Sequence, residues 1–212
     1  MEIRRTANAG VLLKLDGVSI LMDGVCREVK PYPATPPEER EALSKCWPDV
    51  VAFTHAHKDH YDPGYAAAYQ HTGGVILGPA SLPGCHGSME DTVVKGVYIQ
   101  PVVSRHIGLG GKDVDHASFV VQGSRCVLFL GDASPGQWRG RELPKPDVLI
   151  VPYAYCNTPS SWALTKSFGA ETVILLHMPN REEDTIGLWP AVEAVTIGEN
   201  LLIPRMGETI KL

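Results

Sequence analysis

Three histidines and one aspartate lie within six consecutive positions of this chain, in the segment T-H-A-H-K-D-H at positions 54–60. This segment follows directly on the apolar run D-V-V-A-F-T at positions 49–54, which predicts a buried strand. Functional side chains concentrate in loops that a rigid element holds in place. The chain is therefore expected to fold around a buried strand whose C-terminal end opens into a loop of potential metal ligands.

The spacing within this loop predicts two neighbouring half-sites. His55 and His57 are two positions apart, so in an extended segment both imidazoles project to one side and can share a metal ion. Asp59 and His60 follow after the chain turns and point elsewhere, where they can serve a second ion. Two-metal hydrolytic sites place their ions about 3.5–4 Å apart. Four potential ligands so close together argue against unrelated surface side chains.

The remaining ligands must come from other segments, and the best candidates also follow strand-like runs. The run at positions 126–130 ends in Gly131-Asp132, and the run at 172–176 ends in His177. A further histidine is needed at the first half-site, and two candidates remain open. His106 follows a strand, as the other ligands do, and is preferred for that reason; His116 opens the next strand, where its ring could instead be structural or face a substrate. The other two histidines, His71 and His86, are interpreted as ordinary surface or loop residues.

These motifs resemble those of the metallo-β-lactamase superfamily. T-H-A-H-K-D-H is similar to the family's H-x-H-x-D-H motif, and a histidine, a Gly-Asp pair and a final histidine follow in the family's order. The upstream V-S-I-L-M-D-G resembles the early hairpin of the family, with Asp23 in its Asp-Gly position. The resemblance covers about residues 5–180, and its layout is most like the L-ascorbate-6-phosphate lactonase-like branch. It implies an α/β fold, a four-layer αββα sandwich of two mixed sheets with helices on the outer faces, and a metal site at one edge between the sheets.

The resemblance also implies a role for each matching residue. Metal one would be held by His55, His57 and His106, with His116 as the alternative third histidine. Metal two would be held by Asp59, His60 and His177, and Asp132 would bridge both ions. A hydroxide bridging the two ions would attack the substrate, with Asp59 and Asp132 as the catalytic carboxylates. Asp23 is expected to orient a metal-bound histidine. Zinc is expected before manganese or iron, since histidine and carboxylate ligands suit it.

Five further side chains are candidates for contacting a substrate. Arginine can hold a carboxylate or phosphate with its planar guanidinium, although a surface or packing role is the alternative for each of these residues. They are His116, Arg139, Tyr153, Asn157 and Arg181. The expected function is a metal-dependent hydrolase acting on a small, anionic phosphodiester, lactone or amide. The alternatives on the same fold are a mononuclear-iron dioxygenase and an RNA-processing nuclease.

Composition limits the classes of partner that this chain is expected to bind. The net charge of −5 and the absence of any Lys/Arg run longer than two residues argue against a nucleic-acid partner, so a small molecule is expected. No apolar run approaches the length of a membrane span, and no N-terminal apolar stretch resembles a signal peptide. The five cysteines are odd in number and contain no C-x-x-C, which favours reduced thiols in a cytoplasmic protein. Oligomeric state is not predicted.

The pattern of the remaining chain favours one domain over residues 1–212, with short strands alternating with a few helices. Asp16-Gly17 predicts a tight hairpin between strands at 11–15 and 18–23. Helices are expected at about 36–45, 62–69, 160–168 and 190–196. Further strands are expected at 49–54, 75–77, 92–94, 97–103, 118–122, 126–130, 148–151, 172–176, 201–204 and 209–212.

Overall fold

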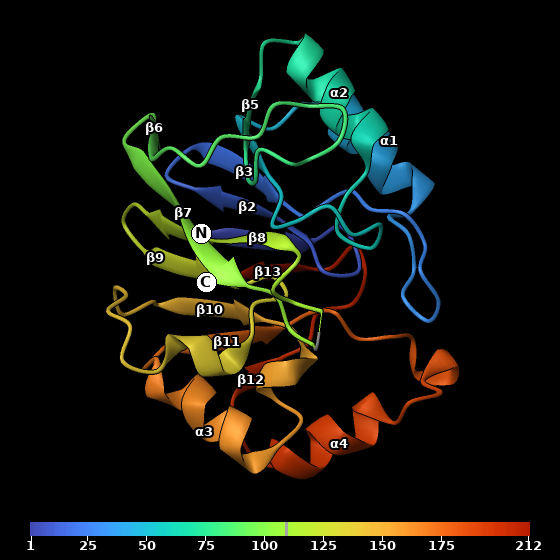
Figure 1. Cartoon of the computed structure of the whole chain (residues 1–212), viewed down its shortest axis with the longest axis vertical. Helices are drawn as coiled ribbons and strands as arrows, with labels where there is room; N and C mark the ends of the chain where they lie inside the picture. The colour runs from blue at the N-terminus through green and yellow to red at the C-terminus, as the bar shows by residue number, and fades with distance from the viewer. Residues whose placement is uncertain (109) are drawn as a thin grey trace.

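The computed structural model of the chain, which describes residues 1–108 and 110–212, contains two mixed β-sheets (Figure 1). The first sheet has the strand order β13 (Thr209–Lys211), β1 (Glu2–Arg5), β2 (Val11–Leu15), β3 (Val18–Met22), β4 (Val50–Ala52) and β5 (Val75–Leu77). The second has the order β12 (Leu201–Leu202), β11 (Thr172–Leu175), β10 (Val148–Val151), β9 (Cys126–Phe129), β8 (Asp115–Gln122), β7 (Val97–Arg105) and β6 (Thr92–Val94). The pairs β3–β4, β4–β5, β9–β10, β10–β11 and β11–β12 are parallel, and the other pairs are antiparallel.

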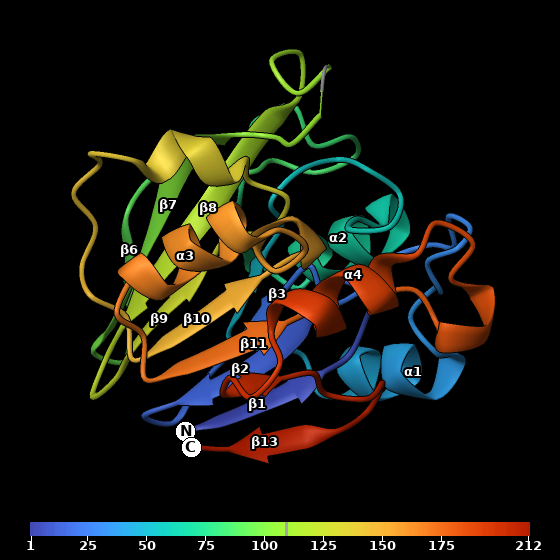
Figure 2. The same cartoon turned by 90° about the horizontal axis from the view of Figure 1, so that it is seen from below.

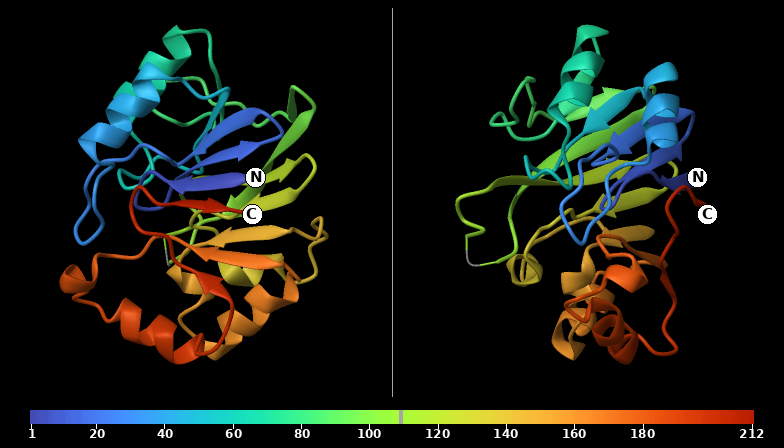
Figure 3. Two further views of the ribbon diagram at one scale, coloured as in Figure 1. Left: turned by 180° about the vertical axis from the view of Figure 1, so that it is seen from behind. Right: turned by 90° about the vertical axis from the view of Figure 1, so that its right-hand side faces the viewer.

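In the described part of the chain, four helices lie on the outer faces of the two sheets (Figures 1 and 2). They are α1 (Pro37–Lys45), α2 (Pro63–His71), α3 (Pro159–Ser167) and α4 (Leu188–Val195). Helices α1 and α2 cover the first sheet, and α3 and α4 cover the second, as the two further views also show (Figure 3). Residues 1–108 and 110–212 also contain three short 3₁₀ turns, namely η1 (Pro135–Trp138), η2 (Tyr153–Tyr155) and η3 (Arg181–Glu183). The expected αββα sandwich is confirmed.

Strand β8 shows why the sheets stack in this way. Successive side chains of a strand point to opposite faces. Phe119 and Val121 pack into the apolar layer between the two sheets, whereas Val120 joins the cluster under α3 and α4. All three are buried. A strand that is apolar on both faces has to be covered on both, and this requirement places helices outside and a second sheet inside.

The chain ends lie together at one side of the first sheet. Strand β1 pairs with both β2 and β13, and the Met1 amino group donates a hydrogen bond to the Leu212 carbonyl over 3.1 Å. Figure 1 shows the two termini side by side. Among the described residues, none of the helices combines the length and the apolar character needed to cross a membrane.

The loop that carries the histidine cluster is fixed at both of its ends. At its start, the Thr54 carbonyl accepts a hydrogen bond from the Ala117 amide of β8 over 2.8 Å, which ties the two sheets together. At its end, α2 begins with an Asp62 cap, whose carboxylate accepts from the Tyr65 amide over 2.7 Å, and with proline at its first position. Within the loop, the His57 carbonyl accepts from the amides of His60 and Tyr61. The turn that separates the two half-sites is therefore locked by its own backbone.

Candidate metal centre

The candidate ligands lie at one edge of the sandwich, where four strands end. His55, His57, Asp59 and His60 follow β4, and His106, Asp132 and His177 follow β7, β9 and β11. A backbone hydrogen bond joins two of these loops directly, since the Ile107 amide donates to the Asp132 carbonyl over 2.8 Å. The His177 amide donates to the carbonyl of Asn8, in the loop between β1 and β2, over 3.1 Å. The structure thus brings together residues from positions 55 to 177.

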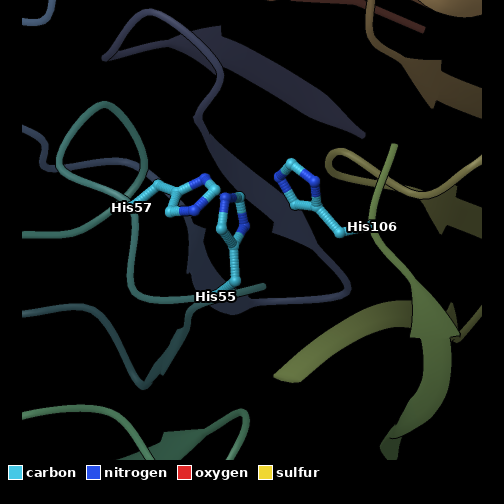
Figure 4. Close-up of side chains that lie close together, drawn as sticks. All are labelled: His55, His57 and His106. Carbon is cyan, nitrogen blue, oxygen red and sulfur yellow. The ribbon is translucent and has the colours of Figure 1, made fainter. Parts of the chain in front are cut away.

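Three imidazoles form a first group of potential ligands. One ring nitrogen from each of His55, His57 and His106 lies within 4.8 Å of the other two. Their ring centroids are 4.5–4.7 Å apart, and Figure 4 shows the three rings turned toward one another from the loop and from the end of β7. His106, the preferred of the two candidates for the third position, is the histidine that completes this group.

A second group consists of Asp59, His60 and His177, and a third of His55, His60 and Asp132. Nε2 of His177 lies 3.2 Å from Oδ2 of Asp59. The three groups overlap, since His55 and His60 each belong to two of them. The potential ligands therefore form one continuous cluster and not separate sites.

Asp132 stands at the centre of this cluster. Its Oδ2 lies 3.4 Å from Nε2 of His60, 3.6 Å from Nε2 of His106 and 3.5 Å from Nε2 of His177. These separations exceed an ordinary N–H···O hydrogen bond. Two ligand atoms that are each about 2.0–2.1 Å from one tetrahedral ion lie about 3.4 Å apart. The spacing around Asp132 is thus that of atoms arranged around a cation.

A buried carboxylate at the end of β3 fixes the direction of two of the imidazoles. Asp23 accepts hydrogen bonds from the Thr54 amide over 2.7 Å and from the Thr54 hydroxyl over 2.6 Å, and it lies 2.8 Å from Nδ1 of His60. The hydroxyl proton of Thr54 is used in this contact, so Nδ1 of His55, 2.9 Å from that hydroxyl, must be the donor there. Nδ1 of His60 likewise donates to Asp23. In the neutral form of each ring the proton is therefore on Nδ1, and Nε2 faces the cluster.

The ring of His106 is also oriented by a hydrogen bond at Nδ1, but its partner is a backbone carbonyl. Its Nδ1 lies 2.7 Å from the carbonyl oxygen of Ile107, which can only accept, so Nδ1 carries the proton and Nε2 is free. Nε2 of His55, His60 and His106, Oδ1 of Asp132 and both ring nitrogens of His177 are buried without a hydrogen-bond partner among the described residues. Buried polar atoms are rarely left unpaired. The donor set of imidazole nitrogens and carboxylate oxygens fits divalent metal ions.

The electrostatics hold four of the proposed ligands in the forms that bind cations, and His60 is the exception. Burial alone would lower the pKa of His60, but the carboxylates of Asp132 and Asp23 raise it well above its ordinary value, so a cation has to displace a proton from this ring. Burial holds the pKa of His55 well below its ordinary value, and burial together with His106 lowers the pKa of His57, so both rings are neutral at neutral pH. Burial alone would raise the pKa of Asp132, but the surrounding histidines, His177 and His60 foremost, hold it well below the ordinary range. The pKa of Asp59 is lowered for a similar reason: contacts with His177 and His60 outweigh the effect of burial.

His116 lies beside this cluster with its own chain of hydrogen bonds. The hydroxyl of Ser118 donates to the Leu130 carbonyl over 2.9 Å, so Ser104 must be the donor in its 3.0 Å contact with Ser118. Nδ1 of His116 must then donate to Ser104 over 2.7 Å. Nε2 of His116 is left unprotonated and without a partner among the described residues. The ring centroid lies 5.1 Å from that of His55, although His116 belongs to none of the three ligand groups.

Backbone strain is concentrated at the same place. His177 has φ +57° and Asp23 has φ +47°, in the left-handed region that side chains other than glycine rarely adopt. Gly131 has φ +53°, and a Cβ atom there would lie 2.4 Å from Cγ2 of Thr54. The Gly131-Asp132 turn can therefore approach the histidine loop only because residue 131 lacks a side chain.

Of the other four predicted substrate-contacting residues, one lies beside the histidine cluster and three have no polar contact with it in the described part of the chain. The ring of Tyr153 lies 6.0 Å from that of His177, at the rim of the cluster. Arg181 instead pairs with Glu193 and stacks on Trp189, its guanidinium carbon 3.9 Å from the ring centroid. Arg139 is exposed and Asn157 half-buried. Within residues 1–108 and 110–212, no hydrogen bond or ion pair joins any of these four side chains to the histidine cluster.

Sequence reasoning missed several residues that complete the site. Tyr32, from the loop between β3 and α1, places its ring 4.3 Å from that of His177. Thr54, Ser104 and Ser118 hold the imidazoles as described above. Thr54 directly precedes the motif, and that position could have indicated its role. Tyr32 and the serines lie in segments that carry no such local signal.

Solved structures confirm the architecture. A possible metal-dependent hydrolase from Veillonella parvula DSM 2008 superposes with a TM-score of 0.74 at 16% identity, over 100% of this chain and 99% of that one. An isothiocyanate hydrolase from Delia radicum gut bacteria has a TM-score of 0.66 at 18% identity, over 100% and 99%. CmlA, a diiron beta-hydroxylase from Streptomyces venezuelae, has a TM-score of 0.65 at 14% identity, over 100% of this chain and 54% of that one. At these identities the likeness shows the fold alone.

Comparison of the amino-acid sequence with models of protein families identifies the family of this chain. A search of curated protein sequences finds no match to this chain. The family model described as "Beta-lactamase superfamily domain" matches residues 2–178, which include every candidate ligand. Since this match covers well over half of the chain, the protein belongs to the metallo-β-lactamase superfamily.

Proposed function

We propose that this protein is a hydrolase that uses two divalent metal ions to act on a small anionic substrate. The observation that carries the proposal is the position of Asp132, whose Oδ2 lies 3.4–3.6 Å from Nε2 of His60, His106 and His177. One carboxylate that touches both half-sites is what a pair of neighbouring ions requires. The hydrogen bonds at Nδ1 of His55, His60 and His106, and their buried Nε2 atoms without a partner among the described residues, support the same proposal.

The proposed ligands follow the two outer groups. His55, His57 and His106 would hold one ion, Asp59, His60 and His177 the other, and Asp132 would contact both. Bound ions would supply Lewis-acid chemistry, acidifying water and polarising the bond to be broken. Zinc is proposed first, because imidazole and carboxylate suit it, with manganese and iron as alternatives.

The protein's own residues would position the reactants. Asp59 has one carboxylate oxygen against His177 and would orient the attacking water as well as bind metal. Tyr153 stands at the rim beside His177, and burial raises the pKa of its phenol, so the hydroxyl stays protonated at neutral pH and can donate to a substrate oxygen. His116 presents an unprotonated Nε2 near His55 and would accept a hydrogen bond from the substrate. A phosphodiester, a lactone or an amide fits these groups, and a place near the L-ascorbate-6-phosphate lactonase-like branch stays a prediction.

Metal analysis and hydrolysis assays test the proposal together. Purified protein should contain about two equivalents of divalent metal and hydrolyse bis-p-nitrophenyl phosphate or simple lactones, with activity lost to a chelator. Asp132→Ala should reduce activity by more than about a hundredfold, because it removes the carboxylate common to both half-sites. Asp113→Ala, which removes an exposed carboxylate, is the matched control.

Other outcomes would favour the alternatives. One equivalent of iron with no second metal would support the mononuclear-iron dioxygenase. Retention of RNA at physiological salt would support the nuclease. Hydrolysis that is indifferent both to the chelator and to Asp132→Ala would contradict the dinuclear hydrolase.

A further inference from the structure

A cavity of about 740 Å³ lies outside the metal cluster and includes none of the candidate ligands in its lining. It is bordered by the loop before α1, the segment after His177, the start of α4 and the loop before β13. Its wall adjoins the cluster, since the Asn8 carbonyl accepts hydrogen bonds both from the His177 amide and from Nη2 of Arg5, a lining residue. Figure 2 shows η3 and α4 on the side of the molecule toward which the loop before α1 extends.

Arg5 is a buried cation in this wall. Its side chain donates to three backbone carbonyls, those of Ala7 over 3.2 Å, Asn8 over 3.1 Å and Pro204 over 3.0 Å. The residue is 8% exposed, and no carboxylate lies within ion-pair distance of it in the described part of the chain. Buried arginines are normally paired with an anion. Burial lowers the pKa of Arg5 to about 10, so the guanidinium is charged at neutral pH.

The guanidinium also has unused hydrogen-bonding capacity. It carries five N–H groups, and the three carbonyls account for one each on Nε, Nη1 and Nη2. One N–H on each terminal nitrogen has no partner among the described residues. The N–H groups of a guanidinium match the oxygens of a carboxylate or phosphate.

The rest of the lining is positive and partly apolar. Arg181 and Arg205 join Arg5, against the single acidic side chain of Glu182, so the lining sums to 3 − 1 = +2 in a chain of net charge −5. Arg181 is already paired with Glu193, outside the lining, whereas the exposed Arg205 has no side-chain ion pair among the described residues. Apolar side chains complete the wall, namely Met178, Trp189, Ile203 and Met206.

We propose that this cavity binds a small organic anion, with its carboxylate or phosphate against Arg5 and its apolar part against Trp189 and its neighbours. The site is separate from the metal cluster, and the proposal does not depend on hydrolysis. Arg205, an exposed residue of the lining, supplies a second positive charge that attracts the anion.

Calorimetric titration of the metal-free protein, prepared with chelator, tests this site without any contribution from metal or turnover. The probes are hexanoate, hexyl phosphate, inorganic phosphate and uncharged hexanamide. Hexanoate or hexyl phosphate should bind at least tenfold more tightly than hexanamide, and the stronger of the two identifies the oxyanion. Weaker binding of inorganic phosphate than of hexyl phosphate would support the apolar wall.

Two substitutions locate the binding. Arg205→Gln should weaken binding of the preferred anion by about threefold to tenfold, because it removes an exposed positive charge from the cavity. Arg125→Gln, which removes a half-buried arginine paired with Glu171 at the β8–β9 turn, outside the lining of the cavity, is the control and should leave affinity unchanged. Arg5→Gln should abolish binding if the variant folds. The proposal is overturned if no anion binds at millimolar concentration, if hexanamide binds as well as hexanoate and hexyl phosphate, or if Arg205→Gln and Arg125→Gln behave alike.

Discussion

Nδ1 of His60 lies 2.8 Å from Oδ2 of Asp23, and both side chains are completely buried. Asp23 follows β3, and His60 stands in the loop after β4, so this contact joins the ends of two neighbouring parallel strands. The same carboxylate accepts two hydrogen bonds from Thr54, which in turn holds His55. One carboxylate therefore orients an imidazole from each of the two proposed half-sites.

Asp23→Asn should weaken metal binding without removing a ligand. An amide oxygen can accept from His60 or Thr54, but it carries no charge and its NH₂ group opposes the Thr54 donors. Loss of such a supporting contact typically costs about 10–100-fold in metal affinity. Competitive titration with a metal-binding dye measures this change, with Asp113→Asn as the exposed control. Equal affinity in Asp23→Asn and the unmodified protein would show that Asp23 does not orient the ligands.

Gly131→Ala should lower the stability of the protein and disturb its metal site. The new Cβ would lie 2.4 Å from Thr54, and φ at this position is +53°. Overpacking and left-handed strain together predict a loss of about 2–4 kcal/mol in the free energy of unfolding. Urea denaturation measures the loss. Gly136→Ala is the matched control, because no neighbouring atom lies within 4 Å of a Cβ placed there. If both variants unfold at the same urea concentration, the Gly131-Asp132 turn does not approach Thr54 as closely as described.

Ser104→Ala should release the ring of His116 from a single tautomer. The chain of donors from His116 through Ser104 and Ser118 to the Leu130 carbonyl places the imidazole proton on Nδ1. Nitrogen NMR of the metal-free protein should therefore show Nδ1 of His116 protonated and Nε2 not. In Ser104→Ala this pattern should be lost, and the unpaired buried N–H should cost about 1–3 kcal/mol of stability. A proton on Nε2 in the unmodified protein would contradict the assignment.

The sequence predicted most of the elements, because hydrophobic runs and turn residues are local signals. Asp16-Gly17 forms the expected hairpin, with φ of +51° and +78° at the two central residues. The expected helix at 190–196 begins earlier, at Leu188, because the Asp184 carboxylate accepts hydrogen bonds from the amides of Leu188 and Trp189. Strand β1 was not predicted. Three of its four residues are charged, and its pairing with β13 depends on the other end of the chain.

The candidate ligands were predictable for a related reason. Each follows a strand, and strands that end at one edge of a sandwich bring distant residues together, as His177 and Asp59 show. The supporting residues were less visible. Tyr32 lies in a loop with no motif, and only the folded chain places its ring against His177. Arg181 was expected near a substrate because it follows His177 by four residues, but its side chain pairs with Glu193 and Trp189 instead.

Asp49 should make stability depend on pH below the neutral range. Oδ1 accepts from Lys95 over 2.7 Å, and Oδ2 accepts from the Ser19 amide and hydroxyl, each over 2.8 Å. The hydrogen bond from Lys95, supported by Ser19, lowers the pKa of Asp49 from 3.8 to about 2. Since the folded-state pKa is below that of the unfolded chain, the stabilisation is complete above about pH 4 and is lost as the pH falls through 2.

Asp49→Asn should therefore cost about 1 kcal/mol at pH 7, a figure reduced for solvent screening because the Asp49 side chain is 25% exposed. The difference from the unmodified protein should shrink between pH 4 and pH 2, where the native carboxylate gains its proton. Urea denaturation at pH 7, 4, 3 and 2.5 measures this trend, and Asp113→Asn provides the exposed control. A difference that stays constant over this pH range would mean that the amide loses hydrogen-bond geometry and that the charge of Asp49 contributes nothing.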